Sequence, residues 1–338
     1  MHKSFIKNVY MKSVKKKVAI IGCGYWGTNI IKTLLSLKNL HIFCYDNNKT
    51  NLIKIKKRFK SVTIVYNLKT ILNDKDLKLS FICVTTSQIF SIAKKCIIHK
   101  KNVFLEKPVS KDFKKIKELF NLSRIKKVRL MVGYVYIYNS YINYIKKKID
   151  SNFLGKIKYA EFNRKNYGPI REDVSSLWDL TSHDMSIVKY FFKNKITQTK
   201  YLRNSITEKK IFDNYSINFN VKKTNININV SWLYPEKIRQ ILIIGTKKIL
   251  MFDEMDTDRP IKIFDILKKY PKASDIPLFY FNPQKNIMIM KPFTPKFKKI
   301  SPLRDELKYC LKNIFTSKKI ITDGQFAVDI AKSLKRFE

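Results

Sequence analysis

The chain has 338 residues, of which 45% are hydrophobic, and it carries a formal net charge of +43 at pH 7. This length and composition leave room for two domains and argue against disorder on the scale of a domain, and no run approaches the roughly 18 apolar residues of a membrane-spanning helix. Only ten of the 69 basic residues are arginine, and the rest are lysines spread along the whole chain, which argues against a specific nucleic-acid reader and favours steering of anionic substrates.

The amino-terminal residues 1–15 are basic, but they lack the apolar core and the small-residue cleavage site of a secretion signal. We interpret them as a short extension. The five cysteines are odd in number and stand at no metal-binding spacing; they are Cys23, Cys44, Cys83, Cys96 and Cys310. This usage predicts reduced core thiols in a cytoplasmic protein.

Between residues 16 and 133, short β-branched runs alternate with helical patterns. The expected strands cover residues 18–22, 41–45, 62–66, 79–84, 103–105 and 128–132. The expected helices cover residues 28–37, 51–59, 87–99 and 112–122. Such alternation predicts βαβ units and a doubly wound parallel sheet, so residues 16–133 are expected to form an α/β domain.

The rhythm changes after residue 133, and residues 134–338 are expected to form a second, α+β domain. The early elements are a helix over 141–149, a strand over 157–162, a polar loop reaching 176 and a helix over 178–192. Alternating runs follow at 215–221, 225–231, 241–244, 249–252 and 261–264. They predict a large, mostly antiparallel sheet, and two closing helices begin at Ser301-Pro302 and after Thr322-Asp323.

A glycine-rich loop follows the first expected strand. Its sequence is Gly22-Cys23-Gly24-Tyr25-Trp26-Gly27, and a helical pattern comes directly after it. The first glycine permits the tight turn, the second lets backbone amides approach a pyrophosphate, and the third allows close helix–strand packing. A strand before this motif and a helix after it are the context of a dinucleotide site, and the alternative is a purely structural glycine turn.

The second expected strand ends at Asp46, about twenty residues beyond the last glycine. A carboxylate there can accept both hydroxyls of the adenosine ribose and would repel a 2′-phosphate. No arginine is adjacent, so NAD is favoured over NADP, although Lys49 leaves NADP open.

Two further motifs carry a family resemblance. The fifth expected strand ends in Glu106-Lys107-Pro108, and the run Trp178-Asp179-Leu180-Thr181-Ser182-His183-Asp184 opens a helix of the second domain. After a glycine loop of this kind, the tripeptide resembles the hallmark of the Gfo/Idh/MocA oxidoreductase family, and the second run resembles that family's D-x-x-x-H element. Ligands of open α/β sheets bind outside the carboxyl ends of the strands, where Glu106 and Lys107 are expected.

The resemblance implies hydride transfer between a nicotinamide and a secondary alcohol or ketone of a sugar. His183 would be the acid/base, oriented by Asp179, and Lys107 would stabilise charge on the same substrate oxygen. The implied cofactor contacts are Gly22, Gly24, Tyr25, Trp26, Gly27, Asp46, Thr85, Thr86, Glu106 and Lys107. The implied substrate contacts are Asn139, Arg171, Trp178 and His183.

The residues themselves support this set and leave alternatives open. Asp179 and His183 are four apart and would share one face of a helix, where a carboxylate can orient an imidazole. The plain alternatives are an Asp–His pair on a helix surface and, for Lys107, one more solvated lysine. No second histidine or cysteine lies near His183, which argues against a metal site.

The stretch from Asn163 to Trp178, with Arg171 in it, resembles the branch that acts on nucleotide-linked or amino sugars of surface polysaccharides. Ser186 stands where members similar to inositol dehydrogenase often carry aspartate, which argues against a polyol pocket like theirs. Two rival functions are a non-catalytic NAD-binding regulator or scaffold on the same fold and a basic nucleic-acid binder. The broad sheet predicted for the second domain favours a homodimer or homotetramer.

Overall fold

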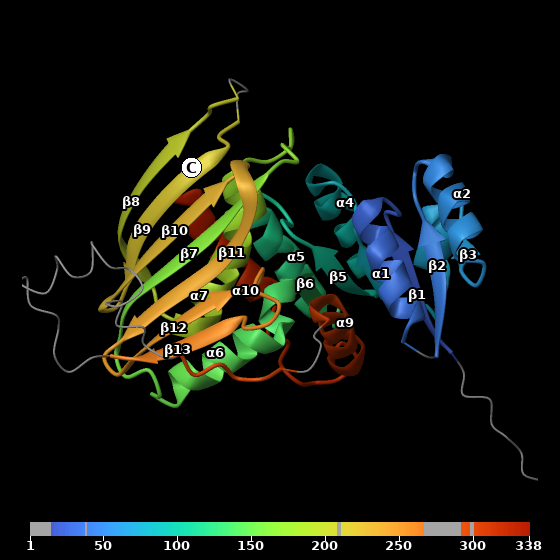
Figure 1. Ribbon diagram of the computed structural model, residues 1–338. Helices are drawn as coiled ribbons and strands as arrows, with labels where there is room; N and C mark the ends of the chain where they lie inside the picture. Colours follow the sequence, from blue (N-terminus) through green and yellow to red (C-terminus); the bar gives the residue numbers. More distant parts are fainter. Residues whose placement is uncertain (1–14, 38, 208–210, 267–291, 298–300) are drawn as a thin grey trace, which may run out of the picture. The chain divides into compact units, whose positions relative to one another are not determined.

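The computed structural model describes residues 15–37, 39–207, 211–266, 292–297 and 301–338 (Figure 1). They form two compact units. The first comprises the chain up to Ser110, residues 114–133 and residues 307–325, and the second comprises residues 111–113, 134–306 and 326–338. The division expected at residues 133 and 134 is one of these transitions, whereas the return of residues 307–325 to the first unit was not expected. Most of the expected extension over residues 1–15 lies outside the described residues.

The first unit is built on a six-stranded sheet in the order β3-β2-β1-β4-β5-β6, and all neighbouring strands are parallel. The strands are β1 (Lys16–Ile21), β2 (Leu40–Tyr45), β3 (Thr63–Ile64), β4 (Leu79–Ile82), β5 (Asn102–Glu106) and β6 (Leu130–Gly133). The helices between them are α1 (Tyr25–Leu35), α2 (Lys49–Arg58), α3 (Leu68–Asn73), α4 (Thr86–Ile98) and α5 (Phe113–Ile125). This is the strand order of a dinucleotide-binding Rossmann sheet, so the predicted fold class is confirmed for this unit.

Burial explains why these runs became central strands. Val18, Ala19, Ile20 and Ile21 of β1 are fully buried, as expected for a parallel strand covered by helices on both faces. Helix α1 turns Ile30, Ile31 and Leu34 into the same core. The spacing of these three residues is the helical one that the sequence displays.

A late segment of the chain completes the first unit. The amide of Val132 on β6 donates to the carbonyl of Thr322 at 2.8 Å, and Met131 forms an isolated bridge with Asp323. Arg129 Nη1 donates to the carbonyl of Thr316 at 2.6 Å. These contacts follow α9 (Pro302–Asn313), and they explain why residues 307–325 group with the first unit. Pairing between residues so far apart in the sequence leaves no local signal. The sequence therefore predicted residues 307–325 as part of the second domain.

The second unit is built on a seven-stranded sheet in the order β13-β12-β11-β7-β10-β9-β8, antiparallel except for the β7–β10 pair. Its strands are β7 (Ile157–Tyr167), β8 (Ile196–Asn204), β9 (Asn214–Val221), β10 (Thr224–Ser231), β11 (Leu233–Gly245), β12 (Lys248–Asp253) and β13 (Ile261–Asp265). Its helical elements are the 3-10 helix η1 (Val135–Tyr138), α6 (Ser140–Asp150), the π-helical turn η2 (Leu177–Thr181), α7 (Ser182–Phe192) and α10 (Gly324–Lys335). The predicted mostly antiparallel sheet is confirmed.

Alternation along β7 decides which side chains meet the helices of this unit. Ala160, Phe162 and Arg164 are buried, whereas the residues between them are less covered. Because side chains alternate between the two faces of a strand, Arg164 is buried on the same face of β7 as Ala160 and Phe162. The strand also continues to Tyr167, five residues beyond its predicted end, so the expected polar loop begins later. Among the residues described, no helix is long and apolar enough to cross a membrane.

Candidate functional site

The glycine loop of the first unit has the backbone that its sequence predicts. Gly22 has φ +95°, and a Cβ there would lie 2.6 Å from the carbonyl oxygen of Cys83 on the neighbouring strand connection. A Cβ on Gly27 would lie 2.0 Å from the carbonyl oxygen of Gly22. Gly24 differs, because nothing lies within 4 Å of its Cβ position. The open space at Gly24, at the amino-terminal end of α1, is where a pyrophosphate needs to approach the backbone amides.

Asp46 lies immediately beyond β2 and is held in place by the loop. Its Oδ2 accepts from the amide of Cys23 at 2.7 Å and from Asn51 Nδ2 at 3.1 Å, and its Oδ1 accepts from the amide of Asn48 at 2.8 Å. These contacts fix the carboxylate beside the glycine loop. An adenosine ribose bound there would meet a pre-oriented acceptor and a negative charge.

A cavity of about 270 Å³ joins the loop and Asp46 within the first unit. Its lining residues are Ile21, Gly22, Gly24, Tyr45, Asp46, Asn47, Asn48, Asn51, Cys83, Val84, Thr85, Gln88 and Ile92. Four expected cofactor contacts therefore line one cavity: Gly22, Gly24, Asp46 and Thr85. The glycine geometry and the placed carboxylate fit a dinucleotide. The sequence interpretation missed the polar side chains of Asn47, Asn48, Asn51 and Gln88, because amide residues are common along this chain and carry no motif.

The other expected cofactor contacts surround the cavity's loop and strands. Tyr25 and Trp26 open α1, with Tyr25 84% exposed, and Thr86 is the first residue of α4 after the cap residue Thr85. Glu106 ends β5 and is buried against β6, where a Cβ on Gly133 would lie 3.2 Å from both carboxylate oxygens. Lys107 follows it at the carboxyl edge of the sheet, before Pro108.

Burial changes the acidity of Glu106. It raises the pKa of the Glu106 carboxyl from its ordinary 4.5 to about 7, against the opposing effects of a hydrogen bond from Trp26 and the charge of Lys107. No hydrogen-bond partner of Oε1 is found among the residues described. A carboxyl that holds its proton more tightly in the folded state stabilises the fold below the unfolded pKa, and this contribution is lost as pH rises through about 7.

We therefore expect the free energy of unfolding of the cofactor-free protein to fall between pH 5 and pH 8 more steeply in wild type than in Glu106→Gln. Between pH 5 and pH 8, the free energy of unfolding should fall by about 3 kcal/mol more in wild type than in Glu106→Gln, because one pKa unit corresponds to about 1.4 kcal/mol. Urea unfolding at several pH values measures it. Glu118→Gln, a half-exposed carboxylate on α5, is the matched control. Parallel pH curves for wild type and Glu106→Gln would contradict the assignment.

In the second unit, the expected acid/base motif lies on an irregular helix start. Leu177–Thr181 forms the π-helical turn η2, and α7 begins at Ser182. Single π turns occur often at functional sites. The Asp179 carboxylate accepts from Arg171 Nη1 and from Trp232 Nε1, each at 3.4 Å. Arg171 also binds both carboxylate oxygens of Asp173, at 2.9 and 2.6 Å.

Three expected substrate contacts have partners within the second unit. Trp178 is 1% exposed, and its Nε1 donates to Glu338 Oε1 at 3.3 Å, so it packs as a core residue that supports η2. A direct contact between its indole and a substrate stays a prediction. Asn139 caps α6 by accepting from the amide of Tyr141 at 2.8 Å, and no hydrogen-bond partner of its buried Nδ2 is found among the residues described. Arg171 is engaged by the two aspartates named above.

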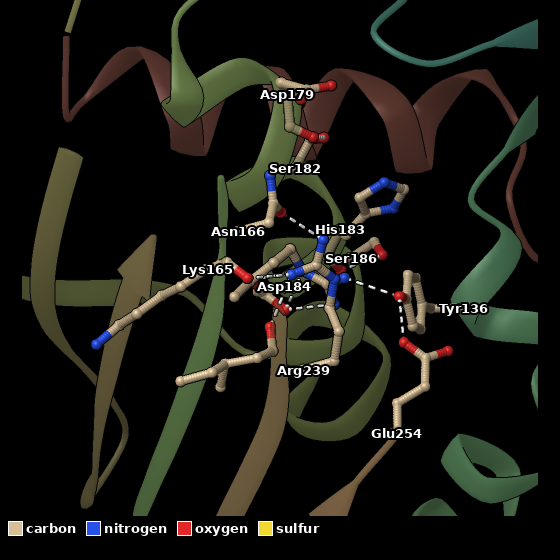
Figure 2. Close-up of polar contacts among 12 residues, drawn as sticks. Tyr136, Lys165, Asn166, Asp179, Ser182, His183, Asp184, Ser186, Arg239 and Glu254 are labelled. Carbon is tan, nitrogen blue, oxygen red and sulfur yellow. Dashed lines mark hydrogen bonds and ion pairs between the residues drawn. The ribbon is translucent and has the colours of Figure 1, made fainter. Parts of the chain in front are cut away.

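His183 lies on the first turn of α7 beside a tyrosine that sequence interpretation missed. The ring of His183 meets that of Tyr136 edge to face, with centroids 5.2 Å apart and planes at 70° (Figure 2). The next residue, Asp184, forms a buried ion pair with Arg164. Tyr136, Arg164 and Trp232 come from η1, β7 and the β10–β11 connection, so no local spacing links them to His183. Alternation along β7, once extended past residue 162, was the one available signal for Arg164.

The fold and these sites define a class: a two-unit protein with a dinucleotide-binding Rossmann domain and a second domain in which a histidine follows a π-helical turn. The family model described as "Oxidoreductase family, NAD-binding Rossmann fold" (GFO_IDH_MocA) matches residues 16–134. Residues 16–134 are thus similar to the NAD-binding Rossmann domain of the Gfo/Idh/MocA oxidoreductases.

Known proteins extend the likeness to the rest of the chain. The uncharacterized oxidoreductase YhhX of Escherichia coli is 31% identical over 114 residues, which are 34% of this chain and 33% of YhhX. The chain spans between a third and just over half of the length of the curated relatives it matches. UDP-N-acetylglucosamine 3-dehydrogenase GnnA from Acidithiobacillus ferrooxidans has a TM-score of 0.80 at 15% identity, with 96% of both chains covered. GenD2 from gentamicin A biosynthesis, solved in complex with NAD, has a TM-score of 0.77 at 14% identity, covering 95% of this chain and 93% of GenD2. At these identities, the structural likenesses establish the fold.

Proposed function

We propose that this protein is an NAD-dependent oxidoreductase that moves a hydride between the cofactor and a secondary alcohol or ketone of a sugar. The observation that carries the proposal is the combination of a pyrophosphate loop with a fixed Asp46 in one unit and, in the other, His183 on the first turn of α7, directly after the π-helical turn that carries Asp179. A binding-only protein has no need for the second set, and this argues against the regulator or scaffold alternative.

The chain's own residues supply positioning and proton handling. The open backbone at Gly24 would hold the pyrophosphate, and Asp46 would hold the adenosine ribose. NAD, when bound, supplies the hydride chemistry. His183 accepts the proton of the substrate hydroxyl during oxidation or returns it during reduction, and Asp179 stabilises the charged imidazole. Lys107 stabilises negative charge on the same oxygen, and Glu106 contacts the ribose on the nicotinamide side.

We further propose a nucleotide-linked or amino sugar as the substrate. The net charge of +43 favours capture of an anionic substrate by long-range steering. The likeness to GnnA, whose name specifies a UDP-linked amino sugar, supports the same class. Ser186 donates to the carbonyl of His183 at 2.6 Å. It stands where members similar to inositol dehydrogenase often carry aspartate, and this argues against an inositol-type pocket.

The experiment that tests the function is an absorbance screen for NADH formation with UDP-linked sugars, UDP-linked amino sugars, free sugars and polyols. We expect turnover with the UDP-linked group. Tight NAD binding without turnover on any compound in either direction would favour the regulator alternative. Affinity for DNA that depends on base sequence would favour the nucleic-acid alternative.

Cofactor choice gives a sharper prediction. Asp46→Ser should weaken NAD binding by about tenfold and narrow the preference for NAD over NADP, because it removes a charged acceptor for the ribose hydroxyls and the repulsion of a 2′-phosphate. Calorimetric Kd values for both cofactors measure the effect. Asp76→Ser, which removes an exposed negative charge from the same unit, is the control for net charge. An unchanged ratio of the two Kd values in Asp46→Ser would contradict the assigned role of Asp46.

A further inference from the structure

A buried ion pair in the second unit lies outside the residues that the proposed reaction uses. Arg164 Nε donates to both carboxylate oxygens of Asp184 at 3.0 Å, and Nη2 donates to Oδ1 at 2.8 Å. The two side chains are 5% and 2% exposed. Desolvating such a pair is costly and replacing it by apolar residues is often neutral, so its presence calls for a role other than stability alone.

The remaining nitrogen of Arg164 extends the pair to Tyr136. Arg164 Nη1 donates to the Tyr136 hydroxyl at 2.8 Å. This hydroxyl donates to Glu254 Oε2 at 2.8 Å (Figure 2). The guanidinium carbon of Arg164 also lies 4.3 Å from the centre of the Tyr136 ring. The phenol of η1 is thus held from β7 on one side and from the turn after β12 on the other. With its hydrogen given to Glu254 and its pKa raised by burial, it is no proton donor to a substrate.

The same network encloses His183 from two directions. Asp184, the next residue on α7, ties the backbone of the first helical turn to Arg164. The Tyr136 ring packs edge to face on the imidazole itself. Figure 2 shows His183 and Tyr136 side by side, with Glu254 on the far side of the tyrosine hydroxyl. Other charged groups of this region are Arg239 on β11, which interacts electrostatically with Arg164, Asp184 and Glu254, and Asp179 on η2 with its partner Arg171.

We infer that Tyr136, clamped by Arg164 and Glu254, is a positioning residue that sets the orientation of the His183 imidazole. The inference rests on the proposed role of His183 as the acid/base. Proton transfer needs a heavy-atom approach of about 3 Å, and a misplacement of about 1 Å can cost a hundredfold in rate. Because Arg164 and Glu254 hold its hydroxyl, the Tyr136 ring has a fixed position and restricts rotation of the imidazole. An aliphatic side chain of similar volume would lack these contacts and would leave the imidazole free to rotate.

The test combines a spectroscopic measurement on the imidazole with kinetics. The full chain has only four histidines, so the ring signals of ¹³C-labelled histidine in the intact protein are assignable with His183→Ala. Spectra are recorded for wild type, Tyr136→Leu and Tyr136→Phe. Tyr134→Leu is the matched control, because Tyr134 is buried nearby in edge-to-face contact with Phe326, at 5.4 Å and 62°. The kcat and KM of each variant are measured on the substrate found in the screen.

We expect Tyr136→Leu to move or broaden the His183 ring signals and to lower kcat by about 10- to 100-fold at little change in KM, with NAD affinity retained. Tyr136→Phe keeps the ring and loses the clamp, so its signals and kcat should lie between those of wild type and Tyr136→Leu. Tyr134→Leu should leave the His183 signals in place.

Two results would overturn the inference: wild-type His183 signals in both Tyr136 variants, or an equal displacement in Tyr134→Leu. If Tyr136→Leu fails to fold, the intermediate effect expected of Tyr136→Phe decides alone. Absence of turnover in the wild-type screen would count against the proposed function, and the imidazole signals would still test the positioning by Tyr136.

Discussion

Replacing His183 with alanine should lower kcat at least about a hundredfold at saturating substrate, the usual range for a positioned acid/base. The alanine variant has no group to take the hydroxyl proton. Hydride transfer would therefore have to produce a protonated ketone, or the proton would have to pass directly to water. NAD affinity should change little, because the cofactor cavity belongs wholly to the first unit. Steady-state NADH formation and a separate NAD titration measure the two quantities.

His99→Ala is the matched control for the loss of a histidine. His99 is exposed at the end of α4, where its ring contacts the carbonyl of Lys95. This variant should keep wild-type kcat. A His183→Ala enzyme with near-normal kcat would remove His183 from the chemistry and with it the proposed mechanism.

Lys107→Ala should also lower kcat at least about a hundredfold, because it removes the cation that we propose stabilises developing charge on the substrate oxygen. Lys107→Arg keeps the charge and should retain more activity than the alanine variant. The loss should persist at saturating NAD, which separates it from weakened cofactor binding.

Removal of Lys107 has a second, independent signature. Its charge lowers the pKa of the neighbouring Glu106, so Lys107→Ala should raise that pKa above its value of about 7. Lys95→Ala, an exposed lysine on α4, should leave both kcat and the Glu106 titration unchanged. Full activity in Lys107→Ala would identify Lys107 as one more solvated lysine.

Local signals were enough to predict the parallel sheet of the first unit and the glycine loop beside it. The glycine loop, Asp46 and the strand that ends in Glu106 each combine a residue type with a neighbouring element, and sequence shows both at once. The cavity at the loop gathers residues from the ends of consecutive strands, as parallel βαβ topology requires. The parallel topology thus explains why residues that are separate in the sequence line one cavity.

The second unit was predicted less completely, for two physical reasons. Strand β8 has mostly exposed side chains on both faces, so it lacks the alternation by which a half-buried strand is recognised. The contacts around His183 join η1, β7, α7 and the turn after β12 across the sheet. Glu254 and Arg164 look like ordinary charged residues until the sheet order brings them to one tyrosine. Trp178 is a further example, because the hydrogen-bond partner of its indole is Glu338, 160 residues away in the sequence.

The proposed mechanism requires the Lys107 amine and the His183 imidazole to act on one reacting hydroxyl. A double-mutant cycle of His183→Ala and Lys107→Ala, read as kcat/KM for the best sugar substrate, tests it most directly. Groups that act on the same oxygen in one step are strongly non-additive, so we predict that the double variant is little slower than the slower single variant. Losses that simply multiply would mean that the two side chains act independently, and would contradict the claim.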